Sequence, residues 1–180
     1  MPTNYGFVGG AGDDSPYTTT NNLDTTAGAA TSISEAVVAS GTNTRAFLTR
    51  NGVPNNAAWV DSRTQSTFLD VSVGNMNIRA RCKVGRTDGT NTILQEGAFT
   101  AYQTLTTVQQ YTFSPVAPAW TDAQENTANQ FFVVFEFNNT SSMGTESVQY
   151  LLFSTGDAVT DDSYLTLDIE ASTRRIFWIN

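Results

Sequence analysis

The alternation of apolar and polar positions is clearest between Gln130 and Asn138, where the chain reads Gln-Phe-Phe-Val-Val-Phe-Glu-Phe-Asn. With a period of two residues, one face is entirely apolar, and the other is apolar at its start and polar at Glu136 and Asn138. Aromatic and β-branched residues suit a pleated, half-buried surface. The Asn-Asn-Thr-Ser-Ser that follows is typical of a turn and favours a strand over a buried helix. We therefore predict a central strand with one face in a core and the other partly covered.

Residues 76–86 alternate most regularly. One face carries Met76, Ile78, Ala80, Cys82 and Val84, and the other carries Asn77, Arg79, Arg81 and Lys83. This pattern predicts a strand with a dry face and a wet, basic face. Asp88-Gly89 then predicts a hairpin turn into residues 92–95. Cys82 stands at an apolar position, so we interpret it as a small buried hydrophobe rather than a reactive thiol.

Other segments also have strand patterns, and residues 33–38 could form a helical turn or an edge strand. Further strands are expected at 45–49, 67–73, 98–105, 109–113, 147–153, 164–170 and 176–179. Strands that follow one another without helices pair largely antiparallel, and the Phe-rich faces require a second sheet to cover them. The predicted fold class is all-β: an antiparallel two-sheet β-sandwich, jelly-roll-like, with an extended N-terminal arm. The pattern leaves the strand order open.

The first 31 residues differ from the rest of the chain. They are rich in Gly, Thr, Asn and Asp and have few apolar side chains, so alone they could not bury enough surface to offset their ordering entropy. We therefore divide the chain into an arm at 1–31 and a β-sandwich domain at 32–180. The arm is expected to lie on its own domain or on a neighbouring subunit. Its candidate contact residues are Tyr5, Phe7, Val8 and Tyr17.

Charge and composition exclude several classes of partner. The 180 residues carry a net charge of −8, with 14% charged residues. Binding to nucleic acid depends on neutralising phosphates, and docking on anionic lipid also requires a basic surface, so neither partner is expected. The sequence has no apolar run long enough to span a membrane. Its first residues, Met-Pro-Thr-Asn-Tyr-Gly, lack the basic start and apolar centre of a secretory signal.

The residue types exclude most catalytic systems. The chain has no histidine, which excludes Ser-His-Asp and Cys-His systems and most catalytic zinc sites. The glycine-rich residues 6–12 match no nucleotide fingerprint. Two carboxylates across a cleft could serve a glycosidase, and the candidates are Asp70, Glu96, Glu136, Asp168 and Glu170. Glu136 is the most interesting of these, but a strand-end glutamate that meets solvent or a partner arginine is the simpler interpretation. We predict no catalytic residue and no cofactor.

Acidic loops offer a weak metal hypothesis. Asp157, Asp161 and Asp162 share one loop, and Asp13 and Asp14 share another. Carboxylate oxygens suit calcium, but this spacing is not that of an EF-hand. A solvated acidic loop is the alternative interpretation.

Two groups of residues are candidates for partner or subunit contacts. Arg79, Arg81 and Lys83, with Arg86 just beyond, hold four of the nine basic residues. They form either a solvated strand face that limits edge pairing or a contact for an acidic surface, such as another copy of this chain. At the C-terminus, Trp and Arg are favoured interface residues, and the candidates there are Arg174, Arg175, Phe177 and Trp178.

The order of segments between Trp59 and Phe153 resembles a known class. Trp59-Val60 is followed by Ile78–Val84 and the Asp88-Gly89 turn. Thr104–Thr107, Gln110–Phe113 and Phe131–Phe137 come after them. This order is similar to that of tailed-bacteriophage virion structural proteins of jelly-roll type, with capsid decoration (cement) proteins the nearest match.

The resemblance implies a non-enzymatic homotrimer on the capsid surface. It would be bound to the major capsid protein lattice and assembled in the host cytoplasm. Because the resembling segments contain no site motif, no functional residue of that class can be assigned to a position in this chain. Two alternatives stay open: another virion component (tail, neck or fibre), and a carbohydrate-binding β-sandwich that would use Tyr102, Trp120 and Trp59.

Overall fold

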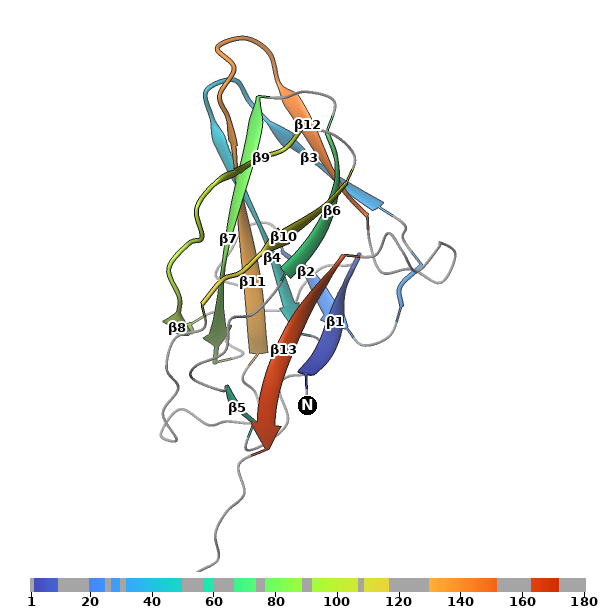
Figure 1. Cartoon of the computed structure of the whole chain (residues 1–180), viewed down its shortest axis with the longest axis vertical. Helices are drawn as coiled ribbons and strands as arrows, with labels where there is room; N and C mark the ends of the chain where they lie inside the picture. Colours follow the sequence, from blue (N-terminus) through green and yellow to red (C-terminus); the bar gives the residue numbers. More distant parts are fainter. Residues whose placement is uncertain are drawn as a thin grey trace, which may run out of the picture.

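The computed structural model describes residues 2–9, 20–24, 27–29, 32–49, 57–59, 67–73, 77–88, 92–106, 109–116, 130–151 and 163–171. These residues form an all-β structure (Figure 1). The strands are β1 (Pro2–Val8), β2 (Thr20–Asp24), β3 (Ser32–Val37), β4 (Thr42–Thr49), β5 (Ala57–Trp59), β6 (Thr67–Val73), β7 (Ile78–Thr87), β8 (Ile93–Glu96), β9 (Gln103–Thr104), β10 (Gln109–Phe113), β11 (Gln130–Asn139), β12 (Glu146–Leu151) and β13 (Tyr164–Ala171). Over these ranges no helix is long and apolar enough to cross a membrane.

Eight of the strands pair as a jelly roll. One sheet has the order β3–β12–β6–β10 and the other β4–β11–β7–β8, with every pairing antiparallel. If these eight strands are numbered 1 to 8 along the chain, the first sheet has the order 1 (β3), 8 (β12), 3 (β6), 6 (β10). The other sheet has the order 2 (β4), 7 (β11), 4 (β7), 5 (β8), and together these two orders are those of a jelly roll. The predicted antiparallel, jelly-roll-like sandwich is therefore confirmed.

Strands from both ends of the chain connect the two sheets. β2 lies parallel to β4, β1 pairs with β2 and β13, and the start of β13 pairs with β6. The part of the predicted arm that the structure describes is thus hydrogen-bonded into its own chain. Of the two locations left open by the sequence, residues 2–8 and 20–24 lie on their own domain.

An aromatic core fills the space between the sheets. The ring of Phe135 in β11 meets Phe113 of β10 edge-on, with 5.7 Å between centroids, and Tyr150 of β12 at 6.3 Å. Phe47 of β4 packs against Tyr150 at 5.5 Å. Phe7 of β1 stacks on Phe47 at 4.2 Å, so the N-terminal strand contributes directly to the core. Such aromatic pairs stabilise a core beyond their buried area alone.

The two faces of β11 are as predicted. Its apolar face (Phe131, Val133, Phe135 and Phe137) lies in the main core. On the other face Phe132 and Val134 are buried in a smaller cluster with Ala46, against which Phe99 packs. Glu136 and Asn138 on that same face are partly exposed. Cys82 is fully buried, as expected.

The core corrects one prediction about partner contacts. Phe7 and Val8 are 0% and 2% exposed within their own chain, so the expectation that they contact a partner is wrong. Both side chains are buried because β1 pairs on each side with another strand of the same chain. Tyr5 is partly buried against the core. Tyr17 and the C-terminal candidates Arg174, Arg175, Phe177 and Trp178 lie outside the described residues.

Candidate functional site

The basic face of β7 lies on the outer surface of the second sheet, and a returning segment covers it. Arg79, Arg81 and Lys83 stand opposite Asn138, Glu136 and Val134 of β11. β11 pairs with one edge of β7, and β8 pairs with the opposite edge. After β8 the chain continues along that opposite edge as residues 97–102, which we call the strap. Backbone hydrogen bonds attach this stretch to β7: Gly97 N–H to Val84 O (2.9 Å), Thr100 N–H to Cys82 O (2.8 Å) and, beyond β9, Leu105 N–H to Ile78 O (2.8 Å).

Two aromatic rings of the strap contact the basic side chains. Lys83 Nζ lies 4.9 Å from the Phe99 ring centroid, and Arg81 Cζ lies 4.5 Å from it. Arg81 Cζ also lies 4.5 Å from the Tyr102 centroid, and Arg79 Cζ lies 4.4 Å from the same ring. Alternate residues of a strand are about 6.8 Å apart on one face, which leaves room for a ring between successive cations. Lys83, Phe99, Arg81, Tyr102 and Arg79 therefore form a cation–aromatic ladder.

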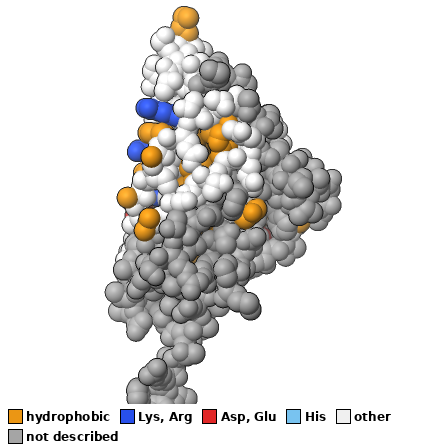
Figure 2. Space-filling view, viewed as in Figure 1, with side chains coloured by type: hydrophobic (Ala, Val, Ile, Leu, Met, Phe, Trp, Pro, Cys, Tyr) orange, Lys and Arg blue, Asp and Glu red, His pale blue; other side chains and the backbone are white. Residues whose placement is uncertain are grey.

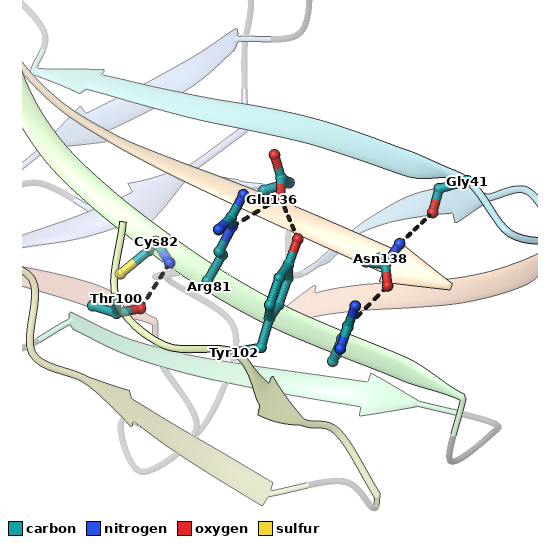
Figure 3. A network of polar contacts seen from close by, with 8 residues as sticks. Gly41, Arg81, Cys82, Thr100, Tyr102, Glu136 and Asn138 are labelled. Atoms are coloured by element: carbon teal, nitrogen blue, oxygen red, sulfur yellow. Dashed lines mark hydrogen bonds and ion pairs between the residues drawn. The ribbon is translucent and has the colours of Figure 1, made fainter. Parts of the chain in front are cut away.

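Acidic and amide groups neutralise or fix the ladder's cations (Figure 3). Arg81 donates through Nε and Nη2 to Glu136 Oε1, each at 2.8 Å, and the Tyr102 hydroxyl donates to the same oxygen. Lys83 Nζ lies 2.7 Å from Glu96 Oε2. Arg79 Nε donates to Asn138 Oδ1 at 2.8 Å. The pKa of Tyr102 is raised above 10.0 by burial first, and then by its hydrogen bond to Glu136 and the charge of that carboxylate.

The strap changes the interpretation of the basic face. The side chains of Arg81 and Lys83 are 32% and 13% exposed, so the expected wet face is wrong for Lys83 and only partly right for Arg81. It is right for Arg79, which is exposed. Arg86, which was expected just beyond the strand, lies within β7 and is only 2% exposed, with its guanidinium 5.2 Å from the Phe131 ring centroid. The rings that cover this face, Phe99 and Tyr102, belong to the strap and not to β7. The alternation within β7 gives no information about what covers it, so the sequence did not predict the strap or the role of Phe99.

Three of the candidate catalytic and sugar-binding residues, Glu136, Glu96 and Tyr102, have structural contacts here. Glu136 meets a partner arginine, which was the simpler interpretation, and Glu96 is paired with Lys83. Two guanidiniums lie over the ring of Tyr102, so its faces are not open for stacking on a sugar. Asp70, Asp168, Glu170 and Trp59 lie in strands β6, β13 and β5 at positions where only the backbone is described.

The calcium candidates are outside the described ranges. These are Asp157, Asp161, Asp162, Asp13 and Asp14, and Trp120 is also outside. Among the residues that are described, no group of three or more His, Cys, Asp or Glu side chains could hold a metal ion.

Fold and site together define a jelly-roll β-sandwich in which an aromatic strap covers the basic outer face of β7. No protein-family model matches the chain, and no curated protein matches it.

Proposed function

We propose that this chain is a non-enzymatic structural protein of a tailed-bacteriophage virion. It binds the capsid exterior as a homotrimeric decoration (cement) protein. One observation carries the proposal: the strand pairing is that of a jelly roll, the fold implied by the resemblance between Trp59 and Phe153. A fold alone hosts many functions, so the support comes from the agreement between the pairing and the order of the resembling segments.

The outer face of the second sheet suits a protein displayed in many copies. Exposed sheet edges are templates for pairing with other chains, and natural β-proteins cover or blunt them. Here β8, the strap and β9 all bond to one edge of β7, and the ladder holds the strap over the sheet. Copies crowded on a shell would then attach through their intended contacts. Modest interfaces, repeated across a lattice, add up to firm attachment.

Tyr102, one of the three aromatic residues proposed for the carbohydrate-binding alternative, is not available to stack on a sugar. The Tyr102 ring has Arg79 and Arg81 over it, and aromatic side chains that bind sugars need an open face. A location in the tail, neck or fibre remains the principal alternative within the virion.

Sedimentation tests the proposal. The purified protein is mixed with empty shells assembled from the major capsid protein of the same genome, and free and bound fractions are measured after pelleting. Analytical ultracentrifugation of the protein alone gives its oligomeric state. A trimer that pellets with shells supports cementing. A protein that ignores shells but pellets with isolated tails belongs elsewhere in the virion, and a monomer retained only by a polysaccharide column contradicts a virion role.

A further inference from the structure

Three connections meet at one end of the jelly roll, which we call the tip: residues 38–41, residues 140–145 and Asn77. Figure 1 shows the β3–β4 and β11–β12 connections together at this end. Ser40 donates from its backbone N–H to Ser141 O at 2.9 Å, and Thr140 N–H donates to Asn77 O at 2.8 Å. The side chain of Asn139 donates to Val37 O at 3.0 Å and to Gly144 O at 3.3 Å. These bonds connect the three segments of the tip to one another.

The tip exposes apolar side chains. Met143 is 81% exposed and Val38 is 59% exposed. Figure 2 shows hydrophobic side chains at this apex, with basic side chains on the flank below it. Interface cores are enriched in Met and Arg relative to the rest of a protein surface. Ordered loops that present such residues lose little conformational entropy when they bind.

Arg79 lies at the rim of the tip in a fixed orientation. Its Nε donates to Asn138 Oδ1 at 2.8 Å, and Asn138 Nδ2 donates to Gly41 O at 3.2 Å, which connects the arginine to the 38–41 turn. Its guanidinium rests on the Tyr102 ring, with Cζ 4.4 Å from the centroid. Arg79 is exposed, and its hydrogen bond within the described residues is made by Nε, which leaves the two terminal nitrogens as donors for a partner. That geometry suits a carboxylate.

The charges at the tip identify the kind of partner. Residues 38–41, 77–79 and 138–145 include one charged side chain, Arg79, although the whole chain has a net charge of −8. A symmetric contact between two tips would need a self-complementary surface. These segments supply no carboxylate, and the next one along the chain, Glu146 at the start of β12, is only partly exposed and already makes a contact within its own chain. The carboxylate for Arg79 is therefore expected from a different surface.

We propose that the tip is the docking surface of this protein. Its partner is a lattice surface that offers a carboxylate beside an apolar pocket. Met143 and Val38 enter the pocket, and Arg79 binds the carboxylate. This inference rests on the proposed function and names the contact through which it acts.

Pelleting with empty shells of the same genome's major capsid protein tests the docking surface. The variants are Met143→Ser, Arg79→Gln and, as a matched control, Val116→Ser, because Val116 is 63% exposed and lies away from the tip after β10. Urea unfolding of each variant confirms that it folds. We expect Met143→Ser and Arg79→Gln each to weaken shell binding at least about fivefold, as interface anchors do. Val116→Ser should bind within about twofold of the wild type.

The outcomes separate the two proposals. A wild-type protein that does not pellet with shells overturns the proposed function and the docking surface with it. A wild-type protein that pellets, with all three variants binding equally well, overturns only the docking surface. Equal losses in Met143→Ser and Val116→Ser indicate non-specific apolar adhesion and also overturn it. A wild-type dimer that Met143→Ser dissociates would assign the tip to a second copy of the chain instead.

Discussion

Replacing Phe7 by alanine tests whether the N-terminal strand belongs to the core. Phe7 lies within the first 31 residues, where the composition suggests an arm. In the structure it is 0% exposed, stacked on Phe47 at 4.2 Å and edge-on to Phe135 at 5.8 Å. Phe7→Ala therefore removes a ring that touches both β4 and β11, and it should destabilise the monomer itself.

The size of the effect follows from the packing. Truncating a buried Phe to Ala costs about 3–5 kcal/mol, because the lost transfer free energy adds to the cavity left behind. The ring pairs with Phe47 and Phe135 favour the upper part of that range. Domains of this kind have a total stability of roughly 5–15 kcal/mol. With a urea m-value of about 2 kcal/mol/M, a loss of about 4–5 kcal/mol should lower the unfolding midpoint by about 2–2.5 M.

Equilibrium urea unfolding, followed by far-ultraviolet circular dichroism at two protein concentrations, measures this loss. Met143→Ala is the control, because its side chain is 81% exposed and its removal should change stability by less than about 0.5 kcal/mol. If Phe7→Ala unfolds at the wild-type midpoint, the strand is a detachable arm and the assignment of Phe7 to the core is refuted. A loss seen only at the higher protein concentration would point to a subunit contact instead.

Three further predictions address β7 and the strap. Gly85→Ala should cost about 1–3 kcal/mol, because a Cβ there would lie 2.4 Å from both Gln95 O and Phe132 Cζ. A urea midpoint equal to that of the wild type would contradict this close packing. Glu136→Gln should cost about 1–2 kcal/mol, allowing for the partial exposure of the pair. A double-mutant cycle with Arg81→Gln should show coupling, and strict additivity would argue against the ion pair. Because the folded-state pKa of Tyr102 is raised above 10.0, its contribution is complete below that pH and is lost as the pH rises through the folded value. Tyr102→Phe should therefore lose less stability than the wild type as the pH rises through 10.0 and above it, with a residual slope from Tyr5, whose pKa burial also raises. Identical slopes would contradict the assignment.

The sequence was sufficient where a strand's own pattern reflects its surroundings. In β11, Phe135 faces the main core and Val134 the smaller cluster on the outer face, as the period of two predicts. The alternation in β7 likewise places Ile78 and Val84 inside. The hairpin from β7 to β8 follows from Asp88, whose carboxylate accepts from Thr92 N–H at 3.1 Å.

Features made by distant segments could not be predicted. Residues 98–105 have the residue types of a strand, yet only Gln103–Thr104 is regular, because Phe99 and Tyr102 turn over the face of β7. Arg86 is 2% exposed despite its charge, since its burial depends on the neighbours of β7 and not on β7 itself. The strand order also depends on contacts between segments far apart in the chain. The pairing of β3 with β12, for example, joins residues more than a hundred positions apart.

The internal ion pairs also reduce the positive charge that the outer face of β7 offers to a partner. The chain has seventeen acidic and nine basic residues, so copies of it repel one another and repel other acidic surfaces at a distance. Arg81 and Lys83 are matched by Glu136 and Glu96, and a paired charge contributes little to the field beyond about one Debye length. On the outer face of β7, Arg79 is held by an amide and a ring rather than by a carboxylate. The three cations of the ladder and the two carboxylates paired with them thus leave one positive charge, that of Arg79, at the rim of the tip, where it can meet a carboxylate of a partner.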